Sequence, residues 1–149
     1  MQIKEIMTKD PQCCTPEQNL VDVARMMRDC DCGAIPVVQE MRDKKPVGII
    51  TDRDITIRAV SEGKIPSQTR VRECMSPRVA TVNPEASVEE CARLMEEKQV
   101  RRLVAVNGAG KVVGMVVQAQ IARNAPAETA GDMIKEISQP TPEMSRRSP

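Results

Sequence analysis

The sequence predicts an α+β protein made of two copies of one β-α-β-β-α unit. Three observations support this fold class. Segments of the first half of the chain recur in the second half at a nearly constant spacing. Each copy carries an amphipathic helical segment followed by two short apolar segments. The chain has 149 residues, and a lone unit of about 60 residues buries too little surface to be comfortably stable. Two such units are therefore expected to share a core.

The repeat begins with a short helical lead-in. Residues 3–8 (IKEIMT) match residues 71–76 (VRECMS), 68 positions later. The same spacing relates residues 34–38 (AIPVV) to residues 102–106 (RLVAV). Gly48 matches Gly114 at a spacing of 66, so a loop of the first copy is two residues longer. A spacing held over this length indicates a duplicated structural unit.

A helix follows the lead-in in each copy. Asn19 with Asp22, and Ser87 with Glu90, have the pattern of an N-cap residue followed by an acid at the third helical position. Apolar residues then recur at the i, i+3, i+4, i+7 spacing of a buried helix face. They are Leu20, Val23, Ala24 and Met27 in the first copy, and Val88, Cys91, Ala92 and Met95 in the second.

Two strands and a second helix complete each unit. The predicted strands are residues 35–38 and 47–51 in the first copy, and residues 103–106 and 112–117 in the second. In the second copy residues 107–110 (NGAG) favour a tight hairpin between the strands. The second helix is expected from about Asp52 to Glu62 and from about Ala119 onward.

These elements divide the chain into four segments. We define unit 1 as residues 1–63, the linker as residues 64–70, unit 2 as residues 71–125, and the C-terminal extension as residues 126–149. The end of the extension, from about residue 140, is rich in Pro, Ser and charge and is predicted to be disordered.

The composition excludes several classes of function. The chain has no histidine, so the commonest general base and metal ligand are both missing. It has no aromatic residue on which nucleic-acid bases could stack. A net charge of +1 gives no electrostatic basis for binding nucleic acid or a membrane surface. No nucleophile–base pair can be assigned, so the sequence predicts a protein that is not an enzyme.

Six cysteines offer a disulfide or metal-binding alternative. The N-terminus lacks the apolar stretch of a signal peptide, which predicts a cytoplasmic protein with reduced thiols and no structural disulfide. A soft-metal site at residues 30–32 (CDC) or at Cys13 and Cys14 is one alternative. A core role is the favoured interpretation for most of them, because Cys91 lies on a buried helix face.

Several of these stretches resemble a known family. They are residues 4–8 (KEIMT), 32–38 (CGAIPVV) and 48–55 (GIITDRDI), with their counterparts 73–77 (ECMSP), 101–106 (RRLVAV) and 114–117 (GMVV). Over roughly residues 1 to 125 the chain resembles a tandem CBS-domain protein, also called a Bateman module. The resemblance implies two β-α-β-β-α units packed pseudo-symmetrically through their sheets, commonly associated into a homodimer. It also implies regulation of a partner protein by an adenosine ligand bound between the units.

The residues around the end of one predicted strand fit such a ligand. Thr51 lies at a strand–helix junction, where unpaired N–H groups favour phosphate, and by resemblance its hydroxyl contacts phosphate and Asp54 binds the ribose. Residues 51–54 (TDRD) also have the pattern of an ordinary capping box, which needs no ligand. By resemblance the remaining site residues come from unit 2, with Leu103 against adenine. The complete predicted set is Thr51, Asp52, Arg53, Asp54, Ala80, Thr81, Arg101, Arg102 and Leu103.

Unit 2 departs from this pattern. Val117 and Gln120 stand where unit 1 has Thr51 and Asp54, and valine cannot donate a hydrogen bond to phosphate. The sequence therefore predicts one good site and one weakened or vacant site, the latter formed by Cys14, Ala34, Ile35, Pro36 and Gln120. Arg101 and Arg102 suit forked phosphate contacts, and at least one of them is expected in the site. The alternative is that they are solvated surface charges or form ion pairs between subunits.

Three functional hypotheses follow. The first is a regulatory module that binds AMP, ADP, ATP, NAD or S-adenosylmethionine, acts as a homodimer and signals to an effector protein. The second is a ligand-free interaction scaffold. The third is a metal or redox sensor that uses the thiols.

Overall fold

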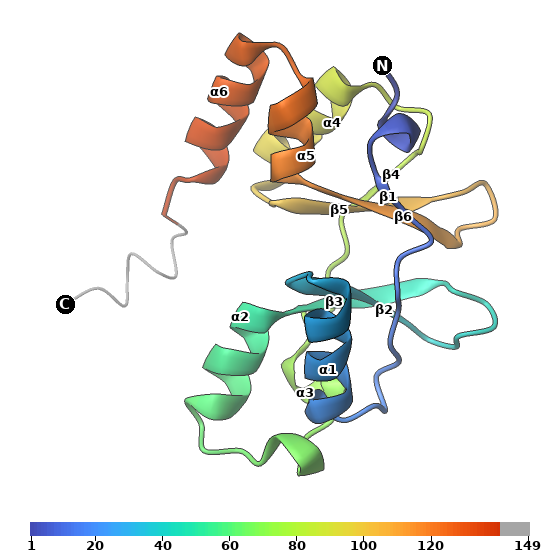
Figure 1. The fold of residues 1–149 in the computed structure, drawn as a ribbon, viewed down its shortest axis with the longest axis vertical. Coiled ribbons are helices and arrows are strands. Elements are labelled where there is room, and N and C mark those ends of the chain that lie inside the picture. Colours follow the sequence, from blue (N-terminus) through green and yellow to red (C-terminus); the bar gives the residue numbers. More distant parts are fainter. Residues whose placement is uncertain (141–149) are drawn as a thin grey trace.

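Two layers of β-structure face one another across the middle of the molecule, and helices cover the outer side of each layer (Figure 1). This computed structural model describes residues 1–140; the predicted disorder at the end of the chain falls on residues 141–149, which lie outside that range. The mixed helix and strand content confirms the α+β class. The boundaries assigned to the two units stay a prediction.

Unit 1 and the linker follow the predicted order of elements. These are η1 (Ile3–Glu5), β1 (Thr8–Lys9), α1 (Leu20–Cys30), β2 (Ala34–Val38), β3 (Pro46–Thr51), α2 (Asp52–Ile55), η2 (Thr56–Val60) and η3 (Pro66–Gln68). The second helix of the unit is therefore one α-helical turn continued by a π-helical turn, and it ends near Val60.

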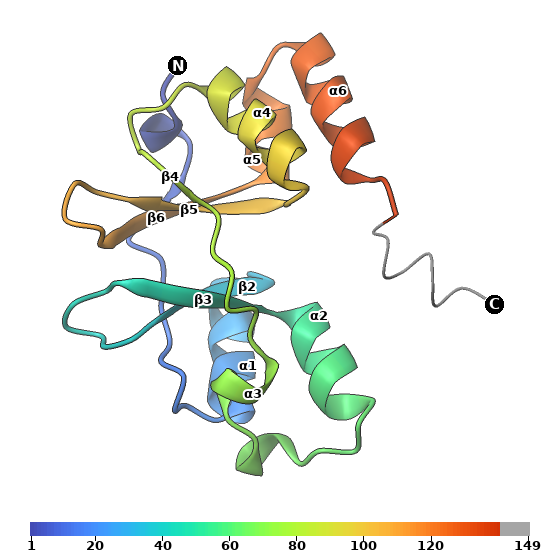
Figure 2. The ribbon, with the colours of Figure 1, turned by 180° about the vertical axis from the view of Figure 1, so that it is seen from behind.

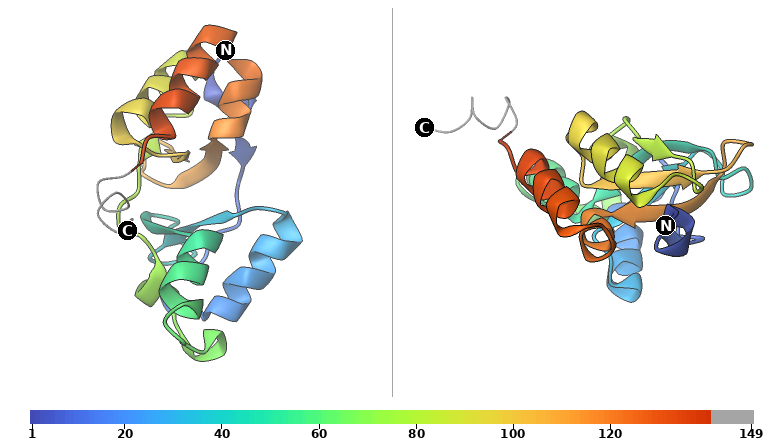
Figure 3. Two further views of the ribbon diagram at one scale, coloured as in Figure 1. Left: turned by 90° about the vertical axis from the view of Figure 1, so that its left-hand side faces the viewer. Right: turned by 90° about the horizontal axis from the view of Figure 1, so that it is seen from above.

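Unit 2 repeats the arrangement and adds a helix. Its elements are α3 (Val71–Cys74), β4 (Thr81–Val82), α4 (Val88–Lys98), β5 (Arg102–Val106), β6 (Val112–Val117) and α5 (Gln118–Asn124), followed by α6 (Ala127–Ile137) in the extension. The sequence did not predict α6. Figure 3 shows it lying beside α4 and α5, where it buries Met133 and Ile137 in the core of unit 2.

The predicted helix caps are confirmed. The Asn19 Oδ1 accepts a hydrogen bond from the Asp22 N–H at 2.9 Å, and the Ser87 Oγ accepts one from the Glu90 N–H at 3.0 Å. All four apolar residues predicted on the α4 face are buried. On α1, however, Ala24 is exposed, which the sequence did not predict.

The different exposure of Ala24 and Ala92 has a structural cause. Ala92 belongs to a core cluster that includes Met133 of α6, and α4 packs directly against α6. Unit 1 has no counterpart of α6 among the described elements. The outer face of α1 is therefore left uncovered at the position that is buried in unit 2.

The strands pair as two equivalent hairpins. In unit 1, Ile35 pairs with Ile50, and in unit 2, Leu103 pairs with Val116, both in antiparallel register. The tight turn of the second hairpin is confirmed, because the Asn107 Oδ1 accepts hydrogen bonds from the N–H groups of Ala109 and Lys111 at 3.0 Å.

The lead-in segments are exchanged between the units. Figure 2 shows the N-terminal segment beside the strands of unit 2 rather than those of unit 1. The Ile3 N–H donates to the Ala86 carbonyl at 2.9 Å, and Thr8 of β1 pairs with Met115 of β6. In return α3 packs on unit 1, where the Val71 N–H donates to the Gln18 carbonyl at 2.8 Å. Each unit is thus completed by a segment that belongs to the other copy of the repeat.

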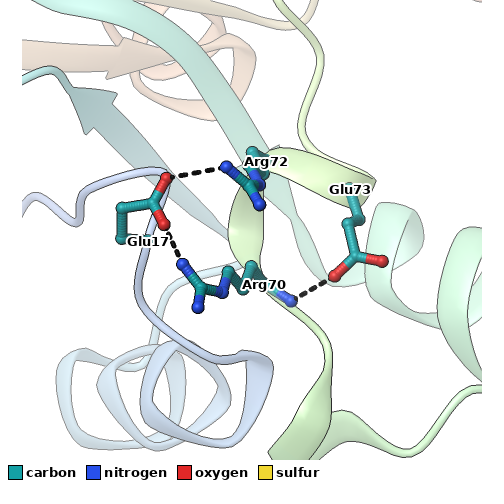
Figure 4. Close-up of polar contacts among 4 residues, drawn as sticks. All are labelled: Glu17, Arg70, Arg72 and Glu73. Atoms are coloured by element: carbon teal, nitrogen blue, oxygen red, sulfur yellow. Dashed lines mark hydrogen bonds and ion pairs between the residues drawn. The ribbon is translucent and has the colours of Figure 1, made fainter.

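Ion pairs mark the place where α3 meets unit 1. The Glu17 carboxylate contacts the guanidinium groups of both Arg70 and Arg72 (Figure 4). The Arg70 N–H also donates to the Glu73 carboxylate at 2.7 Å, and this hydrogen bond lowers the pKa of Glu73. These side chains are about half exposed, and exposed pairs contribute about 0–1 kcal/mol each. They orient the segment, while burial of Val71 and Cys74 holds it.

A small apolar cluster joins the two sheets. It is formed by Cys13, Val38, Val104 and Val112, with Ile49, Val79 and Val106 packed around it. The predicted shared core is confirmed by this cluster. Successive side chains of a strand point to opposite faces of the sheet. Val104 therefore belongs to the cluster between the sheets, while its neighbours Leu103 and Ala105 point to the helix-covered core of unit 2.

Candidate ligand-binding cleft between the units

A cavity of about 470 Å³ opens between the two units. That volume lies within the range typical of small-molecule sites. Four parts of the chain line it: β1 with the loop that follows it, the end of α1 with the start of β2, the start of β5, and the end of β6 with the start of α5. The lining residues are Thr8, Pro11, Gln12, Cys30, Asp31, Cys32, Gly33, Ala34, Ile35, Arg101, Arg102, Met115, Val117, Gln118 and Ala119.

The cavity has apolar walls and a basic rim. Ala34, Ile35 and Met115 are buried, whereas Arg101 is exposed and Arg102 is half-buried. Two guanidinium groups beside an aliphatic wall can bind a ligand that combines a flat apolar ring with an anionic group.

The two strand–helix junctions of the units are built alike. The Asp52 N–H of α2 donates to the Gly33 carbonyl at 3.0 Å, and the Gln118 N–H of α5 donates to the Arg101 carbonyl at 2.9 Å. Each hydrogen bond ties the first residue of a helix to the residue just before the first strand of the hairpin, which is β2 in unit 1 and β5 in unit 2. The cavity is bounded by the second of these junctions and by the segment that includes Gly33.

Thr51 and Asp54 form a complete capping box at the start of α2. The Thr51 Oγ1 accepts from the Asp54 N–H at 3.1 Å, and the Asp54 Oδ2 accepts from the Thr51 N–H at 3.0 Å. Both side chains are half-buried. The cap leaves the hydroxyl proton of Thr51 and the second carboxylate oxygen of Asp54 available. Capping and ligand binding by these two residues are therefore chemically compatible.

Unit 2 keeps half of that arrangement. The Gln120 Oε1 accepts from the Val117 N–H at 2.9 Å, and its Nε2 lies 3.3 Å from the Thr8 Oγ1 of the lead-in. Val117 offers no hydroxyl in return. The amide of Gln120 is thus engaged with protein groups on both of its ends.

The structure brings together residues from both predicted sites. Arg101 and Arg102 were assigned to the Thr51 site, and Ala34 and Ile35 to the weakened site, yet all four line one cavity. Sequence reasoning missed the contribution of the lead-in and of Cys30, Asp31 and Cys32. The other predicted residues do not line this cavity; they are Cys14, Pro36, Thr51, Asp52, Arg53, Asp54, Ala80, Thr81, Leu103 and Gln120.

Leu103 does not fit the role expected for it. Its side chain is fully buried in the core of unit 2, beneath α4 and α5. Side chains alternate along a strand, so the neighbour Val104 faces the space between the sheets instead.

The cysteines fall into two groups. Cys30 and Cys32 are joined by a disulfide, so the prediction of an entirely reduced chain is wrong for this pair. The other four cysteines are free and buried, as predicted for Cys91. Burial raises the pKa of all four thiols, to about 12 for Cys14 and about 12 for Cys91. Within residues 1–140 no group of three or more Cys, Asp or Glu side chains could hold a metal ion.

The chain belongs to the CBS domain family, because residues 3–60 and 71–127 each match the CBS domain. It is a tandem CBS pair. Among relatives, it is 36% identical over 137 residues to the CBS domain-containing protein YhcV of Bacillus subtilis, covering 91% of this chain and 94% of YhcV. It is also 36% identical over 124 residues to the uncharacterized protein MK0525 of Methanopyrus kandleri, but those cover 83% of this chain and only 62% of MK0525.

Solved structures show the same fold. Hypoxic Response Protein I, crystallised with two coordinated zinc ions, superposes with a TM-score of 0.73 at 32% identity, over 85% of this chain and all of that one. The CBS pair of protein MJ0100, in complex with 5′-methylthioadenosine and S-adenosyl-L-methionine, superposes with a TM-score of 0.73 at 25% identity, over 83% of this chain and 94% of that one.

Proposed function

We propose that this CBS pair is a non-catalytic regulatory module that binds an adenosine-containing ligand between its two units and signals its presence to a partner protein. The observation that carries the proposal is the cavity itself, which joins aliphatic walls from unit 1 to two arginines of unit 2. The MJ0100 pair, which holds adenosine ligands on a similar fold, supports the ligand class. The ligands considered are AMP, ADP, ATP, NAD and S-adenosylmethionine.

The placement of the groups suits the parts of such a ligand. Adenine is flat and largely apolar, and it can lie against aliphatic side chains of the cleft. A phosphate or carboxylate can be held by forked hydrogen bonds from Arg101 or Arg102. Because these groups come from both units, a ligand that contacts them all would favour one relative position of the units. That preference is how binding would be transmitted to a partner.

A ligand panel tests the proposal directly. Purified protein is titrated with AMP, ATP, NAD and S-adenosylmethionine by calorimetry and by thermal shift. A ligand at a hundredfold its Kd stabilises the native state by about 2.7 kcal/mol. We expect at least one of the four to bind with one site per chain. Absence of binding by all four would contradict the proposal and favour the ligand-free scaffold.

Two variants distinguish a ligand bound in the cavity from a ligand bound at the Thr51–Asp54 capping box. Arg102→Gln removes a cation from the cavity rim, and Asp54→Asn removes the carboxylate charge while keeping an oxygen that can cap α2. A cavity site predicts weaker binding in Arg102→Gln by about tenfold, the typical loss of a charged hydrogen bond. If Thr51 and Asp54 hold the ribose, Asp54→Asn weakens binding by a similar factor. Asp22→Asn, which makes the same charge change in the first turn of α1, is the matched control.

We further propose that the partner on the outer face of unit 1 is a second copy of the chain. Ile57 and Val60 of unit 1 are exposed there by 39% and 59%, and Ile65 of the adjoining linker is exposed by 56%. Ala24 is exposed on the neighbouring α1. The corresponding face of unit 2 is covered by α6. Light scattering is expected to give a dimer, and Val60→Glu is expected to give a monomer. A monomeric parent protein would contradict this proposal without affecting ligand binding.

Two further predictions concern the location of the protein and the absence of nucleic-acid binding. Within residues 1–140 no helix is both long enough and apolar enough to cross a membrane. The cytoplasmic location and the absence of nucleic-acid binding stay predictions.

A further inference from the structure

A disulfide forms part of the wall of the cavity. Cys30 is at the last position of α1, Cys32 is two residues later, and both line the cleft together with Asp31. The next residue, Gly33, also lines it and accepts the hydrogen bond that begins α2. The sulfur atoms therefore lie next to the residues that shape one side of the cleft.

The end of α4 shows that this disulfide is not needed to form the turn at the end of α1. α1 ends with Asp31 in the left-handed conformation, and the Cys32 N–H donates to the Met27 carbonyl at 3.0 Å. α4 ends in the same way, with Gln99 left-handed and the Val100 N–H donating to the Met95 carbonyl at 3.1 Å. This hydrogen-bond pattern is a common way for helices to end.

The repeat makes the comparison direct. Lys98 and Val100 occupy the positions of Cys30 and Cys32 at the spacing of 68 residues. Unit 2 therefore forms the same helix end with no sulfur at either position. The backbone alone is sufficient for the turn, so the cross-link is not required to shape it.

Among the cysteines of residues 1–140, Cys30 and Cys32 are the two that a reagent in solution can reach. Cys30 is exposed and Cys32 is half-buried, whereas Cys13, Cys14, Cys74 and Cys91 are all buried. Thiolates carry out thiol–disulfide exchange, and the four buried thiols are held in the neutral form. A reductant that approaches the folded protein meets the Cys30–Cys32 pair first.

We propose that the Cys30–Cys32 pair is a thiol–disulfide switch that sets the affinity of the cleft for its ligand. The reductant is a dithiol. One of its thiolates attacks a sulfur of the pair and forms a mixed disulfide, and its second thiolate then displaces the remaining cysteine. The pair gains two electrons and two protons, and the dithiol leaves as a disulfide. Oxidation by a disulfide of the same class reverses the reaction.

The affinity changes because reduction alters the wall itself. The bond ties Cys32 to the helix end, and cutting it leaves two separate thiols that occupy more space and can rotate independently. Both lie beside Gly33 and Ala34 on the unit 1 side of the cavity. Linkage requires the reverse effect as well: a ligand that prefers one form must shift the reduction potential of the pair by the same free energy.

The experiment compares the two redox forms of one protein. It rests on the proposed function, and AMP and S-adenosylmethionine are the probes. Their Kd is measured by calorimetry for the oxidised protein and for protein reduced with dithiothreitol and then freed of it. Native-state alkylation and mass spectrometry report which cysteines are reduced. We expect the two Kd values to differ by at least about fivefold, the lower end of typical coupling between sites. A tenfold difference must appear as a shift of about 30 mV in the potential of the pair.

Two double variants test whether the redox dependence comes from Cys30 and Cys32. Cys30→Ser with Cys32→Ser represents the permanently open form, so it must bind like the reduced protein and ignore dithiothreitol. Cys30→Lys with Cys32→Val copies the residues of unit 2 at the same turn; it must fold and also lose all redox dependence.

The outcomes separate the two proposals. If AMP and S-adenosylmethionine bind neither redox form, the proposed ligand class fails. If a probe binds both forms with the same Kd, the switch is disproved and the ligand proposal stands. Alkylation that finds Cys30 and Cys32 free in oxidised native protein would also overturn the switch.

Discussion

Gly48 of β3 packs directly against the carbonyl oxygen of Ser76. Ser76 lies two residues after the end of α3. A Cβ at Gly48 would lie 2.6 Å from that oxygen, which is too close for two non-bonded atoms. The oxygen cannot retreat easily, because it accepts the Ile49 N–H at 3.0 Å. In unit 2, Gly114 stands in the equivalent place and meets the Met7 side chain of the other lead-in. Both exchanged segments therefore depend on a glycine in the strand that they cross.

The two glycines are expected to differ in their tolerance of a methyl group. Gly48→Ala pushes against hydrogen-bonded backbone, so we expect it to lower the free energy of unfolding by about 3 kcal/mol, the upper end for overpacking. Gly114→Ala pushes against the flexible Met7 side chain, and about 1 kcal/mol is expected. Urea denaturation measures both values.

Gly131→Ala is the matched control for this pair. Gly131 lies within α6, and nothing would contact an added Cβ. Alanine is the better helix former by about 1 kcal/mol, so this substitution should stabilise the protein slightly. Equal losses at Gly48 and Gly114 would contradict the difference between backbone and side-chain neighbours.

The lead-in exchange predicts a large effect of a substitution near the N-terminus. Ile3 is fully buried in the core of unit 2, so Ile3→Ala should cost about 2–5 kcal/mol of unfolding free energy. Chain termini usually tolerate such changes. Lys4→Ala, at an exposed neighbour in η1, should change stability by less than about 0.5 kcal/mol. A small effect of Ile3→Ala would mean that η1 is not docked on unit 2.

The docking of α6 can be tested in the same way. Met133 is fully buried between α6 and the rest of unit 2, and Met133→Ala should cost about 2–5 kcal/mol. Ile134, the next residue, is 42% exposed on the other face of the helix. Ile134→Ala is therefore expected to be nearly neutral. If both variants unfold at the same urea concentration as the parent, α6 contributes nothing to the core.

The buried thiols predict a loss of stability in alkali. Burial raises the pKa of Cys91 from its ordinary 9.0 to about 12. The folded state therefore holds this proton more tightly than the unfolded state does. The resulting stabilisation is complete below pH 9 and is lost as the pH rises from 9 toward 12, at up to about 1.4 kcal/mol per pH unit.

Cys91→Ala isolates that effect. The variant loses some stability at pH 7, but its free energy of unfolding should fall less between pH 8.5 and pH 10.5 than that of the parent protein. The comparison is made under reducing conditions, by urea denaturation at each pH. Parallel pH profiles for the two proteins would show that Cys91 ionises as readily in the folded chain as in the unfolded chain.

Much of the fold could be predicted because its signals are local. The caps at Asn19 and Ser87, the strand segments and the Asn107 turn each depend on residues a few positions apart, and all are present in the structure. The candidate site was harder to predict. Leu103 was assigned to the cleft although it lies in the core of unit 2. A strand that is apolar on both faces gives no sequence signal for which face meets the helices and which meets the other sheet.

The sequence by itself determined that the chain is a duplicated α+β unit of the CBS type with unequal strand–helix junctions, Thr51 and Asp54 in one copy and Val117 and Gln120 in the other. Only the tertiary structure decided that the lead-ins change places, that α6 covers unit 2 alone, and that Arg101, Ala34 and Cys32 share one cavity. The physical reason is that caps and turns are made by near neighbours in the chain. The partner of an apolar face is instead chosen by the total surface that distant segments can bury together.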